Sequence, residues 1–197
     1  MLSFDTTHAI TGCLLDADTH ATADGFRGPP VLLVLHDRPL APAGRRQLRQ
    51  IRAVAFPLDP RDVAAHTQGI PGLLTDLAAA LTDTPTDAAA AVADPDLAGF
   101  TDAVVHTAPD SRLLAWAVLY HDLHAGPAGI REIRRVDAVD VDGRVYQLSR
   151  LHGEPGAVVV IDDQPDPAAT PATQPGLAAL LTTAQTLARH AHHGAHR

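Results

Sequence analysis

The chain has 197 residues, a formal net charge of −8, 46% hydrophobic residues and one cysteine. This length suits one large domain or two small ones, and the hydrophobic content excludes general disorder. A single cysteine excludes an internal disulfide framework, and the acidic balance disfavours general nucleic-acid binding.

The amino-terminal end and the composition suggest where the protein is found. Residues 1–5 carry neither a basic segment nor an apolar run, so we expect no signal peptide. No apolar run reaches the about 18 residues that a membrane span needs, and we expect a cytoplasmic protein. All 15 basic residues are arginine, which, with frequent Ala and Pro, is typical of a high-GC bacterium or its mobile elements. Cys13 is expected to act as a small buried hydrophobe rather than as a nucleophile.

The first third of the chain predicts strands and an arginine-rich helix. Residues 3–15 alternate between apolar or bulky and polar side chains, which favours a strand with a bulge or break at Gly12. Residues 16–30 have the composition of a loop, and residues 31–35 that of a short strand. Residues 44–52 are predicted to be helical, with three arginines on one side: Arg45, Arg49 and Arg52.

A helical middle, residues 60–106, is predicted to follow a short strand at residues 53–58. Asp59-Pro60 is typical of an N-cap followed by proline at the first helical position, and this helix should end near Gly69. A second helix is predicted from Ile70, because apolar residues recur there at helical spacing: Leu73, Leu74, Leu77, Ala78 and Leu81.

Residues 111–163 carry the clearest strand pattern and define the predicted fold class. Runs of β-branched and aromatic residues are separated by Gly, Pro and Asp, at residues 113–120, 136–141, 145–151 and 157–161. They predict an α+β fold with an antiparallel meander of about four strands. The first and last runs are apolar at every position, which is typical of strands covered on both faces.

Asp142-Gly143 lies between two of these runs and predicts a two-residue type I′ turn, in which both central residues need positive φ. Such a turn would set Val139 opposite Tyr146. Because successive residues point to opposite faces, one face near the turn would be apolar and belong to the core: Val139, Val141, Tyr146 and Leu148. The other face is expected to be only partly covered.

The carboxy-terminal part is predicted to close the same α+β domain, which begins at residue 1 and whose sheet ends at residue 163. Residues 164–175 hold four prolines and form an extended connector. Residues 176–190 form an amphipathic helix, expected to pack on the sheet. Residues 191–197 are expected to be a disordered tail, and the histidines near it should bind metal only adventitiously: His190, His192, His193 and His196.

Two candidate sites follow from this arrangement. In a meander, the end of the first strand and the end of the third lie at the same edge of the sheet. This predicts a divalent-metal site from His121, Asp122, His124 and His152, with Glu154 nearby and His36 joining only if its strand lies alongside. The second candidate is an anion or acidic-partner patch on Arg45, Arg49 and Arg52, because guanidinium forks suit carboxylates and phosphates. The alternative for these arginines is an ordinary solvated helix face.

Phosphate-loop, dinucleotide-binding, nucleophile-elbow and HExxH motifs are missing from the sequence, and no residue is singled out as catalytic. We therefore expect a non-catalytic accessory, assembly or partner-binding protein that binds a protein partner or itself, without an organic cofactor. The rival hypothesis is a metal-dependent hydrolase at the His121 edge. A weaker one is a nucleic-acid-associated protein that uses the arginine-rich helix.

Overall fold

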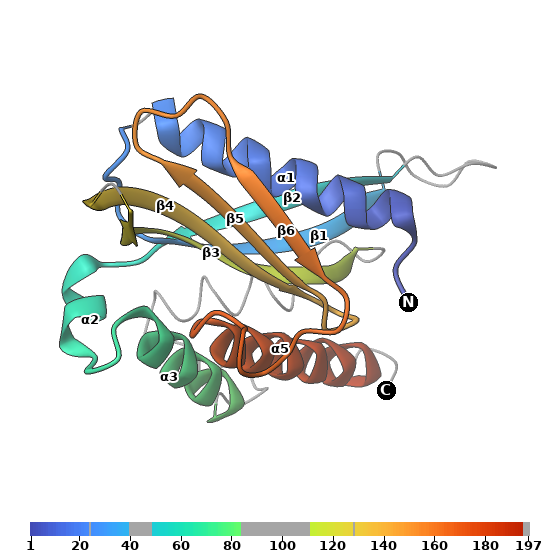
Figure 1. Cartoon of the computed structure of the whole chain (residues 1–197). Coiled ribbons are helices and arrows are strands. Elements are labelled where there is room, and N and C mark those ends of the chain that lie inside the picture. Colours follow the sequence, from blue (N-terminus) through green and yellow to red (C-terminus); the bar gives the residue numbers. More distant parts are fainter. Residues whose placement is uncertain (24, 40–48, 84–110, 128, 195–197) are drawn as a thin grey trace.

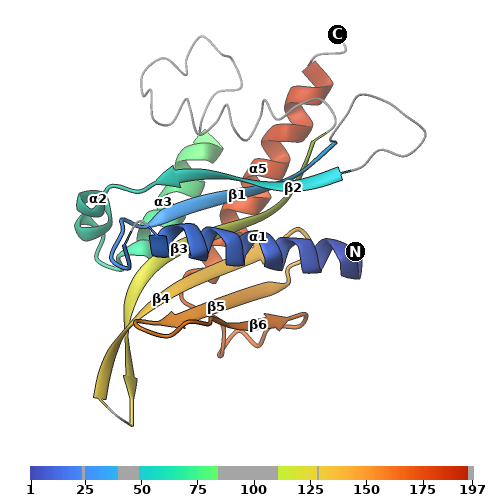
Figure 2. The ribbon, with the colours of Figure 1, turned by 90° about the horizontal axis from the view of Figure 1, so that it is seen from above.

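A computed structural model of the chain describes residues 1–23, 25–39, 49–83, 111–127 and 129–194 (Figure 1). Their core is an antiparallel sheet between one helix on one face and two on the other. Helix α1 (Phe4–Ala23) lies on the first face. Helices α3 (Ile70–Asp83) and α5 (Gln174–Gly194) lie side by side on the second face (Figures 1 and 2). The predicted α+β class with a carboxy-terminal helix on the sheet is confirmed.

The sheet has six strands in the described residues, not about four. Their order is β2-β1-β3-β4-β5-β6, and every neighbouring pair is antiparallel. The predicted meander is β3 (Arg112–Gly126), β4 (Gly129–Asp140), β5 (Val145–Leu151) and β6 (Val158–Asp162). The hairpin of β1 (Val31–Pro39) and β2 (Arg49–Pro57) extends it, because β1 pairs with β3.

The strand predicted for residues 3–15 is wrong, because these residues belong to helix α1. Over the longer window, Ile10, Leu14 and Asp18 recur every four residues and form the buried stripe. Four threonine hydroxyls in or next to this helix donate to the carbonyl four residues earlier, so these polar side chains do not disrupt it: Thr7, Thr11, Thr19 and Thr22. Cys13 is half-buried here, and burial raises the pKa of its thiol, which disfavours the reactive thiolate.

Buried charges fix α1 on the sheet. Asp18 is 0% exposed, and its two carboxylate oxygens accept hydrogen bonds from Arg134 Nε at 2.7 Å and Arg150 Nε at 2.6 Å. Arg134 also donates to the Asp18 carbonyl and to the Thr22 hydroxyl. Near the other end of the helix, Arg144 donates to the Thr7 hydroxyl. The helix is thus attached to the sheet near both of its ends.

Helices α3 and α5 pack on the opposite face through apolar contacts. Their inward residues form one cluster with the sheet, which includes the fully buried Trp116, Leu74 and Leu180. The two helices approach so closely that a Cβ added to Gly176 would lie 2.6 Å from the Cβ of Leu74. Glycine at this position therefore permits the close helix–helix contact. The predicted apolar stripes of both helices are confirmed.

The turn after β4 lies where it was predicted, but the predicted turn type and the predicted strand register are wrong. Gly143 has φ 83°, whereas no described non-glycine residue has positive φ, which excludes a type I′ turn. The Asp140 carboxylate accepts from the amides of Asp142 and Arg144 and from the Tyr146 hydroxyl. Burial raises the pKa of Tyr146 to about 12, so its hydroxyl keeps the proton that it donates.

As a result, the pairing of β4 with β5 is shifted by one residue. Val139 lies opposite Val145, and Ala138 lies opposite Tyr146. A shift of one residue moves side chains to the other face. Val139 and Val145 therefore belong to the α3/α5 core, while Tyr146 and Leu148 belong to the α1 core, so both faces near the turn are buried.

The remaining elements agree in part with the sequence. Asp59 caps helix α2 (Pro60–Ala65) by accepting from the Arg61 amide at 2.8 Å, as predicted, although the helix ends at Ala65. The predicted helical residues 84–106 lie outside the described residues. Helix α5 continues to Gly194 and therefore includes residues 191–194 of the predicted tail. None of the described helices is both long and apolar enough to cross a membrane.

Candidate functional site

Strand β6 is an edge of the sheet that keeps its apolar side chains in solvent. Its exposed fractions are 67% at Val158, 52% at Val160 and 42% at Ile161. The prediction that both faces of this strand are covered is therefore wrong, although it holds for the buried centre of β3. Val158 and Val160 lie on the face of the α3/α5 layer, where α5 packs mainly over β3 and β4 and leaves both valines exposed.

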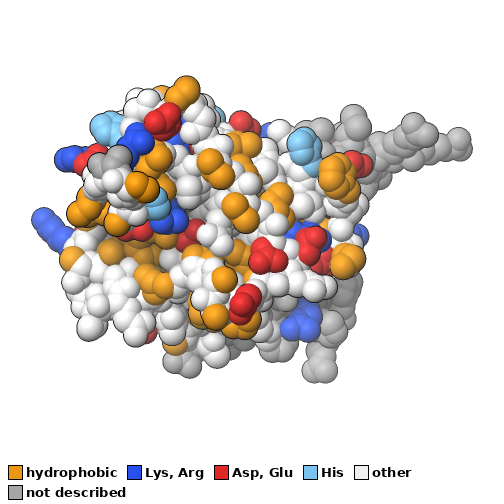
Figure 3. Space-filling view, viewed as in Figure 1, with side chains coloured by type: hydrophobic (Ala, Val, Ile, Leu, Met, Phe, Trp, Pro, Cys, Tyr) orange, Lys and Arg blue, Asp and Glu red, His pale blue; other side chains and the backbone are white. Residues whose placement is uncertain are grey.

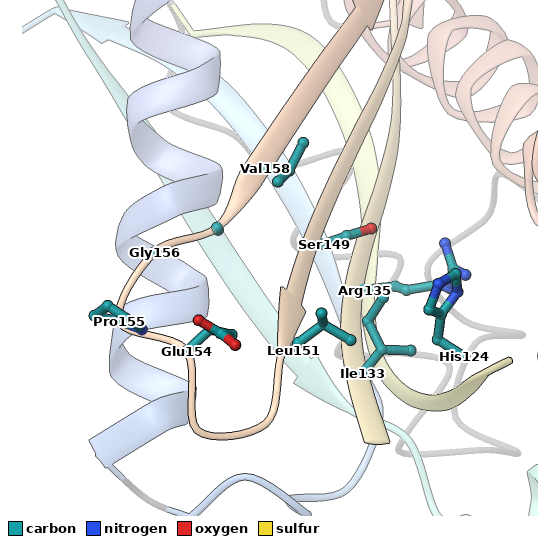
Figure 4. Close-up of a pocket in the computed structure, with 10 residues that line it drawn as sticks. His124, Ile133, Arg135, Ser149, Leu151, Glu154, Pro155, Gly156 and Val158 are labelled. Carbon is teal, nitrogen blue, oxygen red and sulfur yellow. The ribbon is translucent and has the colours of Figure 1, made fainter. Parts of the chain in front are cut away.

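A pocket of 610 Å³ lies on the same face, where β5 leads into β6 (Figure 4). Its floor is the sheet, with Ile133, Leu151 and Val158 as its main apolar side chains. In the close-up, Arg135 and His124 lie at one side, and Glu154 with Pro155 lies in the loop at the other. The size falls in the range of ligand pockets, which are typically about 300–1,000 Å³. The pocket and the exposed side of β6 form one continuous surface, which we call the β6 surface.

Acidic residues stand at both ends of β6. Asp162 and Asp163 end the strand, the exposed Asp166 follows, and Glu154 precedes the strand with a half-exposed side chain. Arg144 pairs with Asp163, and Arg131 pairs with Glu154 at 3.2 Å. Figure 3 shows hydrophobic side chains along this side of the molecule and acidic ones gathered near its middle. The surface is thus apolar in its centre and acidic at its Asp162 end, whereas charges of both signs meet at its Glu154 end.

The four residues of the predicted metal site lie on opposite faces of the sheet. His121 pairs with Arg134 in the register and points to the α1 side. Asp122 points to the other side, where it accepts from Arg135 at 3.0 Å, and His124 lies on that side in the pocket of the β6 surface. His152 lies near His121 and away from Asp122 and His124. Glu154 pairs with Arg131, and His36 is buried in β1, where burial lowers the pKa of its imidazole.

His121 and His152 meet at a residue that the sequence did not indicate. Glu132 Oε2 lies 3.8 Å from His121 Nε2 and 3.4 Å from His152 Nδ1. Both imidazoles also contact the Phe26 ring, with centroid distances of 5.4 and 4.6 Å. Arg27 donates to Glu132 and lowers the pKa of its carboxyl, with the two histidines acting in the same direction.

This group holds the segment after α1 against the sheet. In addition to the two histidine contacts, the Arg134 guanidinium lies 4.9 Å from the centre of the Phe26 ring. Although Glu132 lies between two histidines, no three His, Cys, Asp or Glu side chains in the described residues are arranged to hold a metal ion. Its described contacts attach the Phe26–Arg27 segment to the sheet.

The predicted arginine patch is not a helix face in the described residues. Arg45 lies outside them, and Arg49 and Arg52 belong to strand β2. The helical spacing that would bring the three arginines to one side does not apply in a strand. Arg52 Nε donates to Gln50 Oε1 at 3.3 Å. His190, His192 and His193 belong to α5, and His196 lies outside the described residues.

One further buried polar group lies between the sheet and α5. Asp137 is 1% exposed and accepts hydrogen bonds from the Tyr120 and Thr173 hydroxyls, each at 2.7 Å. Burial raises the pKa of both the Asp137 carboxyl and the Tyr120 hydroxyl. Thr173 immediately precedes α5, so this contact fixes where the helix starts on the sheet.

The sequence contains a signal for the β6 surface, namely a strand that is apolar at every position, but such a pattern is equally typical of a buried strand. The sequence did not indicate the contacts of Glu132 and Phe26 with the two histidines. These contacts depend on how far the β3–β4 hairpin extends beyond His121 (Figure 2). Comparison with protein-family models, curated proteins and solved structures finds no match to this chain.

Proposed function

We propose that the protein is a non-catalytic partner-binding protein and that the β6 surface is where it binds another protein chain. A single observation carries this proposal: β6 is apolar at four of five positions, yet Val158, Val160 and Ile161 are exposed at an edge of the sheet. An edge strand presents unpaired N–H and C=O groups, and proteins usually protect such strands with charges, proline or a covering segment.

The interior of β6 carries none of these protections in the described residues. The strand pairs with β5 on one side, and its only charged residue is Asp162 at its end. The adjoining pocket of 610 Å³ adds an apolar depression to the edge. Exposed apolar surface rimmed by polar residues is typical of protein interaction sites.

The two rival hypotheses lack a comparable observation. A metal-dependent hydrolase would need ligands that converge, whereas His121 and His152 face the α1 side and Asp122 and His124 the other. A nucleic-acid-associated protein would need a basic surface, and the net charge of −8 repels phosphates. We therefore keep partner binding as the single proposal.

Site-specific photo-crosslinking in cells tests it. A photoreactive amino acid replaces Val160 in β6 or, as the matched control, Val54 in the opposite edge strand β2, which is 39% exposed. We expect a discrete protein adduct from position 160 and none from position 54. Absence of an adduct at 160, or equal labelling at both positions, would contradict the proposal.

A further inference from the structure

We infer that the partner segment bound at β6 is an extended strand with apolar side chains at alternate positions and basic residues at the end that lies beside Asp162. It adds to the six-stranded sheet as one more strand. This inference rests on the proposed partner binding and adds the chemical class of the partner.

The edge itself selects an extended segment. A segment that pairs with β6 satisfies the outward N–H and C=O groups, and its alternate side chains point to the same face as Val158 and Val160. The 610 Å³ pocket opens beside Val158, where Ile133 and Leu151 supply an apolar floor. The apolar surface that the added strand meets at Val158 therefore continues inward over β5 and β4.

The charges at the Asp162 end of β6 select basic residues. Asp162, Asp163 and Asp166 stand at one end and Glu154 at the other. Two of these four carboxylates have arginine partners, Asp163 with Arg144 and Glu154 with Arg131. Beside Asp162 three carboxylates stand with one arginine, whereas beside Glu154 Arg131 and Arg135 offset the acid. Lysine or arginine of an incoming strand therefore meets an excess of negative charge at the Asp162 end, while the centre of that strand meets only apolar residues.

The same charges disfavour a second copy of this chain as the occupant. In the symmetric antiparallel pairing that uses the whole strand, Val160 lies opposite Val160 of the other copy. Asp162 and Asp163 then lie at the end of the strand where the other copy has Glu154. Each copy also carries a net charge of −8. The net negative charge of each copy thus opposes self-pairing, although Arg131 lies beside Glu154.

Binding of synthetic peptides to the whole chain tests the inference. The probe has a Val-Thr-Val-Thr-Val core, which matches β6 in length, and two lysines at each end. Its matched control replaces all four lysines with glutamates. We expect saturable binding of the lysine peptide, with a Kd that rises with ionic strength, and a Kd at least about tenfold higher for the glutamate peptide.

Two variants place the binding on β6. Val160→Lys should raise the Kd of the lysine peptide at least about tenfold, because it puts a cation at the centre of the edge. Val54→Lys makes the same change on β2 and should leave the Kd unchanged. Asp162→Asn keeps the side-chain oxygen that accepts from the Gln164 amide, removes one charge, and should raise the Kd by a smaller factor. Each variant should unfold at the wild-type urea concentration.

The outcomes separate this inference from the proposed function. If position 160 crosslinks a partner but the two peptides bind equally, or neither binds, partner binding stands and the basic extended class is wrong. A concentration-dependent dimer in sedimentation that Val160→Lys dissociates would instead identify a second copy as the occupant. If position 160 gives no adduct and no peptide binds, both are wrong.

Discussion

Helix α1 is attached to one face of the sheet by buried charges in addition to an apolar cluster, whereas α3 and α5 cover the other mainly through an apolar cluster. The charged contacts need specific partners, so they fix where α1 lies along the sheet. The apolar contacts are less directional. Those of α5 lie mainly over β3 and β4, and Val158 and Val160 remain exposed. The proposed binding surface lies on this second face, beside the residues that the two helices bury.

The largest effect is expected from breaking the charged contact under α1. Asp18→Asn leaves Arg134 and Arg150 without a carboxylate, although their side chains are only 1% and 12% exposed. Removing one partner of a buried ion pair typically costs about 3–5 kcal/mol. Urea unfolding followed by the fluorescence of the single tryptophan, the buried Trp116, measures the loss.

Asp16→Asn is the control, because this exposed carboxylate lies two residues earlier in the same helix. It should change the free energy of unfolding by no more than about 0.5 kcal/mol. If Asp18→Asn is equally mild, the buried charges do not hold α1, and the proposed contrast between the two faces is wrong.

A cavity on the opposite face should cost less and respond differently to salt. Leu180→Ala removes a fully buried side chain from the α5 cluster, and such changes cost about 2–5 kcal/mol. Because no charge is involved, the loss should be the same at low and high salt in urea unfolding. Leu123→Ala, at a side chain that is 62% exposed, is the matched control and should be nearly neutral. A salt-dependent loss at Leu180 would show that packing alone does not hold α5.

How much the sequence predicted depends on whether a pattern is local. The apolar stripes of α3 and α5 and the uniformly apolar centre of β3 each lie within one segment, and all three predictions are confirmed. The helix α1 was missed because its buried stripe includes the charged Asp18, whose burial depends on arginines from distant strands. A sequence pattern in one window cannot supply such partners.

The candidate sites show the same limit. The meander correctly placed His121 beside His152, but it could not show that the Asp140 side chain reshapes the turn and shifts the register. The exposure of β6 depends on which strands α5 covers, a property of the assembled layers rather than of the strand. The sequence therefore located the strand but assigned it to the core.

The smallest expected effect concerns Asp137, the buried carboxyl beneath the start of α5. Burial raises the pKa of this carboxyl above the ordinary value of 3.8, so the folded state holds the proton more tightly than the unfolded state. The stability that this group contributes is therefore greatest at low pH and is lost as the pH rises from 3.8 through the raised pKa. Asp137→Asn keeps an oxygen that accepts from Tyr120 and Thr173 but does not ionise.

As the pH rises, the free energy of unfolding of Asp137→Asn should therefore increase relative to that of the wild type. The total increase should be about 1.4 kcal/mol for each unit by which folding raises the pKa of Asp137. Urea unfolding of both proteins across the acidic range gives the difference directly, since other groups titrate alike in the two and cancel. Asp166→Asn, an exposed carboxyl, should show no such trend. A difference that is flat with pH, or that favours the wild type as the pH rises, would mean that the hydrogen bonds from Tyr120 and Thr173 stabilise the carboxylate more than burial destabilises it.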